Sequence, residues 1–280
     1  MAITEEKIAQ VQTNSPLEKQ YSQMGKYAVL SAKFPANDNI AQTYTVYYPQ
    51  NAGNYPLVVM VNGSGTPVSR YEAVLKHLAS YGFVVIGDEN GTAWSGATSS
   101  KTLDFALAQN KDSNSVLFNK INPNKIGTSG HSQGGVGVVN LATNQPNGHL
   151  IRSIYGASTT KYGLAMGLKW PYDVSLINVP YMMIAGGHES DAGDGKDYNK
   201  GIAPIMSLQE NYAKVAAPAL MAQRKDVDHG GMLWQPNGYM VAWFLYTLNG
   251  DNQAKQVFVG QNAEIKKNAN WQNVQSKGLN

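Results

Sequence analysis

Apolar, β-branched and aromatic residues recur along the chain in short runs that are bounded by turn residues. Such runs are typical of strands buried on both faces of a sheet. They predict strands at residues 43–48, 57–61, 83–86, 125–128, 151–155, 181–185 and 219–223. Between several of these runs, apolar residues follow the three- and four-residue spacing of a helix face. This spacing predicts helices at residues 71–81, 103–109, 133–143, 205–215 and 238–248.

The alternation of strands and helices predicts an α/β fold, with a mostly parallel central sheet and helices on both faces. The first strands precede the alternation and are expected to form an antiparallel edge. We assign residues 1–42 to an N-terminal lead-in with an edge strand, residues 43–250 to one α/β domain, and residues 251–280 to a polar C-terminal surface extension. A single domain of this size is ordinary, and no large lid domain is expected.

Composition narrows the classes of function. Charged residues make up 15% of the chain and the net charge is +3, which implies neither nucleic acid nor an anionic membrane as a partner. No apolar run is long enough to predict a membrane span. The chain has no cysteines, which excludes disulfides, thiolate metal sites and cysteine nucleophiles. Low charge and 16 tyrosines favour an exported bacterial protein, although the first residues, MAITEEKIAQ, lack a signal-peptide pattern.

The segment KIGTSGHSQGGVGVVN contains the pattern G-x-S-x-G, with Ser132 between Gly130 and Gly134. A predicted strand precedes the pattern and a predicted helix follows it. A nucleophilic serine at such a strand-to-helix turn needs small residues two positions to either side. The alternative is an ordinary glycine-rich turn with a buried serine. The flanking elements favour a nucleophile, and His131 beside it is expected to be structural.

A serine nucleophile needs a base, which is most often histidine. In folds with this turn, the acid and then the histidine follow the serine along the chain. His149, His188 and His229 follow Ser132. His229 lies between the last predicted strand and the last predicted helix, where a loop can carry its ring to the serine. His149 lies in a polar turn and is expected to be solvated, so His229 is the predicted base.

The acid should follow the strand predicted at residues 181–185. Four carboxylates compete there: Glu189, Asp191, Asp194 and Asp197. Their spacing does not separate them. A solvated acidic loop and a calcium loop are alternatives, but the spacing does not match that of an EF-hand.

An oxyanion hole needs two backbone amides, one of which belongs to the residue after the nucleophile. This residue is Gln133. The second amide is expected from Ser64 in the segment VNGSGT, where Gly63 and Gly65 allow the main chain to approach a substrate closely. A glycine turn without a catalytic part is the alternative.

Several of these motifs resemble those of polyester-hydrolysing bacterial cutinases and their chlorophyllase and dienelactone-hydrolase relatives. The similarity covers about residues 43–251 and includes GHSQGG, VPYMMIAGGHESDAG and VDHGG. The resemblance implies an α/β-hydrolase fold and selects Asp191 as the acid. It also implies a serine hydrolase that cleaves carboxylic esters through a Ser132–His229–Asp191 triad and an acyl-enzyme, without a cofactor or metal.

The chain departs from this family in its expected acyl site. Cutinases usually have an aromatic residue where this chain has Ser64, and often methionine where it has Gln133. The aromatic residue that usually follows the next strand is also missing after Tyr155. These changes predict small or partly polar ester substrates, and Trp94, Tyr155 and Trp234 are the candidates to line the cleft. An acyltransferase, thioesterase or amidase with the same triad, or a binding protein without activity, are the alternatives.

Overall fold

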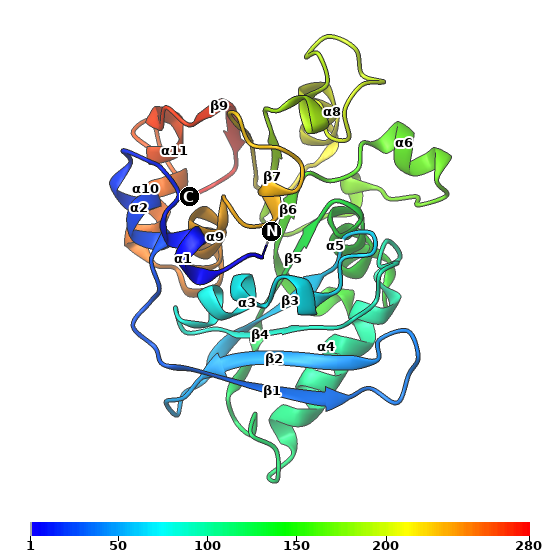
Figure 1. Ribbon diagram of the computed structural model, residues 1–280, viewed down its shortest axis with the longest axis vertical. Helices are drawn as coiled ribbons and strands as arrows, with labels where there is room; N and C mark the ends of the chain where they lie inside the picture. The colour runs from blue at the N-terminus through cyan, green and yellow to red at the C-terminus, as the bar shows by residue number, and fades with distance from the viewer. Residues whose placement is uncertain (1) are drawn as a thin grey trace.

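One sheet of nine strands runs through the computed structural model, which describes residues 2–280 (Figure 1). The spatial order is β1-β2-β4-β3-β5-β6-β7-β8-β9. Neighbours from β4 to β8 are parallel, whereas β1, β2 and β9 pair antiparallel at the two edges. The strands are β1 (Val29–Pro35), β2 (Thr43–Pro49), β3 (Tyr55–Val61), β4 (Val84–Gly87), β5 (Ile121–His131), β6 (Ile151–Ala157), β7 (Tyr181–Gly186), β8 (Ala219–Arg224) and β9 (Trp271–Lys277). The expected mostly parallel sheet with an antiparallel first edge is confirmed.

Helices cover both faces of the sheet, because its central strands are apolar on both sides. Every residue of β3, YPLVVMV, is buried. One apolar cluster joins the sheet to α4 (Ala97–Lys111), α5 (Gln133–Asn144) and α8 (Ile205–Lys214). The other joins it to the remaining core helices, which are α1 (Glu5–Ala9), α2 (Pro16–Ser22), α3 (Glu72–Ala79), α9 (Asn237–Asn249), α10 (Asn252–Phe258) and α11 (Glu264–Lys267). The short α6 (Tyr162–Gly167) and α7 (Glu189–Ala192) follow β6 and β7.

Helix α9 is apolar around most of its circumference, which is typical of a helix buried in a protein interior. Its sequence, NGYMVAWFLYTLN, is buried from Asn237 through Leu245. Trp243 lies at its centre and donates a hydrogen bond from its indole nitrogen to the Ile154 carbonyl oxygen, at 3.1 Å. This bond joins the helix directly to the middle of the sheet.

The last thirty residues differ from the expected surface extension. Helix α10 buries Val257 and Phe258 in the core, and β9 completes the sheet by pairing with β8. Trp271 stacks on Tyr239, with ring centroids 5.6 Å apart. The segment is polar on average, but most of its few apolar residues are buried, so it is part of the folded domain.

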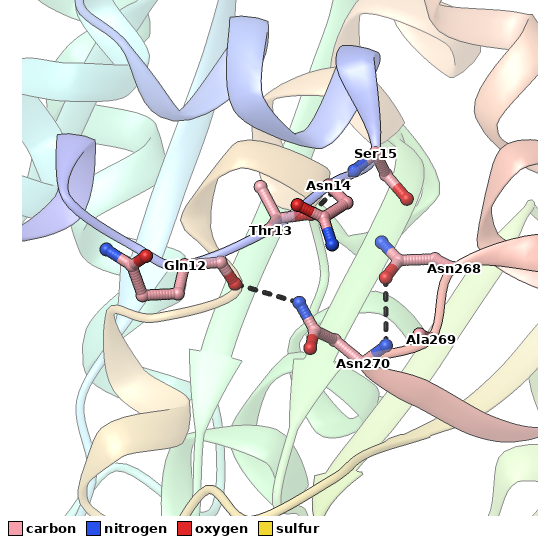
Figure 2. Close-up of a pocket in the computed structure, with 7 residues that line it drawn as sticks. All are labelled: Gln12, Thr13, Asn14, Ser15, Asn268, Ala269 and Asn270. Carbon is pink, nitrogen blue, oxygen red and sulfur yellow. Dashed lines mark hydrogen bonds between the residues drawn. The ribbon is translucent and has the colours of Figure 1, made fainter.

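The two ends of the chain meet on the α9 side of the sheet. The Glu264 carboxylate accepts hydrogen bonds from the amides of Leu17 and Glu18, at 2.7 and 2.9 Å, and so satisfies free N–H groups at the start of α2. Nearby, Asn270 donates from its side-chain amide to the Gln12 carbonyl oxygen, at 2.8 Å. Figure 2 shows the polar cavity between these segments, which is lined by Gln12, Thr13, Asn14, Ser15, Asn268, Ala269 and Asn270.

Candidate active site

Ser132 occupies the sharp turn between β5 and α5. Its backbone has φ 60° and ψ −120°, a strained combination for a residue with a side chain, and one that is found at functional turns. The two flanking glycines permit this turn. A Cβ atom at Gly130 would lie 2.1 Å from the Gly134 carbonyl oxygen, and a Cβ atom at Gly134 would lie 2.1 Å from the Val61 carbonyl oxygen. Any other residue at either position would push strand and helix apart.

Three side chains from separate loops form one hydrogen-bonded row. His229, from the loop after β8, has its Nε2 2.9 Å from the Ser132 Oγ. Its Nδ1 lies 2.6 Å from Oδ1 of Asp191, in α7 after β7. The side chain of His229 is 20% exposed, whereas Asp191 is fully buried. These distances are those of a serine, a base that can accept its proton, and an acid that orients the base.

Asp191 is the one carboxylate of its loop that points into the protein toward His229. Its second oxygen, Oδ2, accepts hydrogen bonds from the Gly186 amide, at 2.8 Å, and from the Ser158 hydroxyl. Asp194, in contrast, is exposed and pairs with Lys200 at 2.9 Å. In residues 2–280, no three His, Asp or Glu side chains gather into a group that could hold a metal ion.

His229 is also held through its main chain. Its amide donates to the Ser190 Oγ at 2.8 Å. Its carbonyl oxygen accepts a hydrogen bond from Nε2 of His131, at 2.6 Å, which fixes that proton on Nε2 because a carbonyl cannot donate. Burial, and then the nearby His229, lower the pKa of His131 to about 4, so its ring is neutral at pH 7. The sequence indicated that His131 is structural, but not which residue it would support.

The loop after β3 lies against the nucleophile. A Cβ atom at Gly63 would lie 3.5 Å from the Cβ of Ser132. Throughout the described chain, the amide nitrogens of Ser64 and Gln133 have no hydrogen-bond acceptor. The Gln133 amide also belongs to the first turn of α5, where free N–H groups favour negative charge. Both amides are therefore available to a substrate oxygen.

The chain matches a known protein family over most of its length. The family described as "PETase: PET hydrolase-like" matches residues 12–273. The chain belongs to this family. Membership in the PET hydrolase-like family agrees with the α/β-hydrolase architecture of the sheet. The matched residues extend beyond 43–251, the range of the resemblance found in the sequence, at both ends.

Three curated relatives of this PET hydrolase-like chain are cutinases of Thermobifida. Cutinase est2 of Thermobifida alba is 30% identical over 108 residues, which are 37% of this chain and 35% of that protein. Cutinase 2 of Thermobifida cellulosilytica is 33% identical over 106 residues, or 37% and 40% of the two chains. Cutinase cut1 of Thermobifida fusca is 33% identical over 106 residues, or 37% and 33%. The match thus spans about a third of the length of these relatives.

The three aromatic residues predicted to line a cleft lie in different surroundings. Tyr155 is 4% exposed and packs toward Phe244 of α9, so it belongs to the core. Alternation along β6 turns it to the face of the sheet that α9 covers. Trp94 is half-buried beside α5, and its carbonyl oxygen accepts a hydrogen bond from Asn140 at 2.7 Å. Trp234 lines a cavity between the N-terminal segment and the loop after β8.

A buried polar network supports the loop after β3, and sequence analysis did not identify it. The Asn62 side-chain amide donates to the carbonyl oxygens of Asp88 and Asn90, at 2.7 and 2.9 Å. The Asp88 carboxylate accepts from the Thr102 hydroxyl and the Asn90 amide, at 2.8 and 2.9 Å. Burial raises the pKa of Asp88 to about 6, although these two hydrogen bonds lower it.

Asp88 is expected to make the protein less stable as the pH rises. Its pKa is about 6 in the folded state and about 3.8 in the unfolded chain, so the folded state binds the proton more tightly. Its contribution is greatest below about pH 4 and is lost as the pH rises through 6. In wild type, this effect lowers the free energy of unfolding by about 2 kcal/mol between pH 4 and pH 7. We predict that Asp88→Asn abolishes this loss. Urea unfolding at both pH values tests this.

The matched control for this experiment is Asp112→Asn, which changes an exposed acid and should leave the difference between the two pH values as in wild type. Equal pH dependence of wild type and Asp88→Asn would contradict the prediction.

Proposed function

We propose that this protein hydrolyses carboxylic esters through an acyl-enzyme on Ser132. The observation that carries the proposal is the unbroken row from Ser132 through His229 to Asp191, with separations of 2.9 and 2.6 Å. Membership in the PET hydrolase-like family supports the same reaction class. No helix in residues 2–280 has the length and hydropathy to cross a membrane.

In the first half of the reaction, the Ser132 Oγ attacks the ester carbonyl carbon while Nε2 of His229 accepts its proton. Asp191 stabilises the imidazolium that forms, because its buried carboxylate is negatively charged and accepts a hydrogen bond from the Nδ1–H of His229. The negative charge on the carbonyl oxygen is stabilised by the free amides of Ser64 and Gln133. The alcohol leaves with the proton from Nε2, and the acyl group remains on Ser132.

In the second half, His229 removes a proton from water, which attacks the acyl carbonyl. The tetrahedral intermediate then collapses, the carboxylic acid leaves, and Ser132 regains its proton. No cofactor takes part. Since the exposed polar side chain of Ser64 stands on the loop that packs against Ser132, we propose that the preferred substrates are small or short-chain esters.

The test is an assay of the purified protein on p-nitrophenyl esters from acetate to palmitate, combined with labelling by a fluorophosphonate. We expect turnover that falls with acyl length, and covalent labelling at Ser132 that an ester competes away. Adding methanol to the assay separates hydrolysis from acyl transfer, since a transferase would form mainly the methyl ester. A protein that neither turns over any ester nor takes the label would instead be a binding protein of this fold.

A further inference from the structure

The side chain of Gln133 is fixed in one orientation beside the candidate oxyanion hole. It is 2% exposed, and its Oε1 accepts a hydrogen bond from the Ala93 amide, at 2.5 Å. A backbone N–H can only donate, so the side-chain oxygen of Gln133, and not its side-chain nitrogen, must face Ala93. The nitrogen, Nε2, therefore faces the other way and donates to the Ser64 Oγ, at 3.0 Å.

This bond determines what the Ser64 hydroxyl can do. Its oxygen accepts from Gln133, so its own proton must point elsewhere. Within residues 2–280 that proton meets no acceptor, and the Ser64 side chain is exposed. Ser64 directly follows Gly63, which packs against Ser132. Ser64 thus has two free donors, its side-chain hydroxyl and its backbone amide.

We propose that the Ser64 hydroxyl donates a third hydrogen bond to the oxyanion of the tetrahedral intermediate, and that the Gln133 side chain positions it. This inference rests on the proposed ester hydrolysis. Ser64 would then contribute both its amide and its hydroxyl. Gln133 would donate from its backbone amide to the oxyanion, and its side-chain amide would orient the Ser64 hydroxyl.

Hydrogen bonds hold the loop that carries Ser64 on both sides of this residue. Gly65, with φ 58°, donates from its amide to the Gly91 carbonyl oxygen at 3.1 Å. Asn62 anchors the other end of the loop to the segment after β4. Donors that are held in place before the reaction stabilise developing charge without having to reorganise.

The first test compares Ser64→Ala with wild type. Alanine keeps the backbone amide and removes only the hydroxyl. Loss of one oxyanion donor costs about a hundred- to a thousandfold in kcat where it has been removed from an oxyanion hole. Two amides remain here and water reaches the site, so we expect a smaller loss of about ten- to a hundredfold in kcat with little change in KM. Ser64→Thr, which keeps a hydroxyl, should recover most of it.

A thionoester separates a hydrogen-bond donor from a structural role. In such a substrate the negative charge develops on sulfur, which is a weak hydrogen-bond acceptor. If the Ser64 hydroxyl donates to this atom, Ser64→Ala should slow the ester much more than the matching thionoester. If the hydroxyl only shapes the loop, the variant slows both substrates equally, and the inference is wrong.

Gln133→Met tests the positioning role. Methionine keeps the backbone amide and the approximate length of the side chain, but it lacks the side-chain amide that bonds Ser64. We expect a smaller loss in kcat than for Ser64→Ala, and no further loss when the two changes are combined. Additive losses would contradict the positioning role.

Ser69→Ala is the matched control, since this exposed hydroxyl in the same segment bonds Glu89 and lies outside the candidate site. If the wild type is inactive, the proposed function is wrong. If the wild type is active and Ser64→Ala has the same kcat, only this inference is wrong.

Discussion

Replacement of Ser132 by alanine is expected to lower kcat/KM for p-nitrophenyl acetate by about a thousandfold or more. The variant loses the only atom to which an acyl group could be transferred in the proposed mechanism, and retains only what binding and the oxyanion donors supply. Steady-state kinetics with active-site titration of the wild type measure the effect. Alanine also fits the strained turn no worse than serine, so the fold should persist.

Ser129→Ala is the matched control for this variant. Ser129 lies three residues earlier on β5, is buried, and contacts the Met240 sulfur at 3.2 Å rather than the triad. It should keep near-wild-type activity. If Ser132→Ala hydrolyses the ester as fast as the control does, a nucleophile on Ser132 is ruled out.

Replacement of Asp191 by asparagine is expected to lower kcat at pH 7 by about a thousand- to ten-thousandfold, by analogy with triads in which the same change favours the wrong histidine tautomer. The asparagine cannot stabilise the imidazolium with a charge, and its NH₂ group can turn toward His229. The ring would then present a protonated Nε2 to Ser132 and could not accept the serine proton. Kinetics between pH 6 and 9, with fluorophosphonate labelling, measure the loss.

The control, Glu189→Gln, removes an exposed acid two residues away and should be nearly silent. The pair also tests the choice among the four acids of this loop. Strong loss in Glu189→Gln with activity retained in Asp191→Asn would reverse the assignment.

The sequence predicted the central sheet well because its strands are short, apolar and separated by clear turn residues. It also indicated the turn at Ser132, where the pattern of glycines has a direct steric cause: neither Gly130 nor Gly134 can carry a Cβ atom without a clash. The spacing of the acids did not single out Asp191. That choice depends on which carboxylate the fold buries and supplies with two hydrogen-bond donors, and only the resemblance to a family selected it.

Other features escaped prediction for different physical reasons. Strand β9, WQNVQSK, is an edge strand with Trp271 as its one fully buried residue, so it lacks the apolar alternation of an internal strand. Val257 and Phe258 lie in an otherwise polar stretch that shows no helix periodicity of its own, and Phe258 is buried by aromatic rings of the preceding helix, α9. The orientation of the Gln133 side chain depends on the main chain at Ala93, which no pattern of side chains encodes.

The joining of the two chain ends has a consequence for biosynthesis. Trp271 donates from its indole nitrogen to the Glu18 carboxylate, at 2.7 Å, across 253 positions of sequence. Glu264 likewise holds the start of α2. Helix α2 therefore cannot complete its native contacts until the segment that carries Glu264 and Trp271 has been synthesised. Until then, α2 is available to chaperones or to proteases.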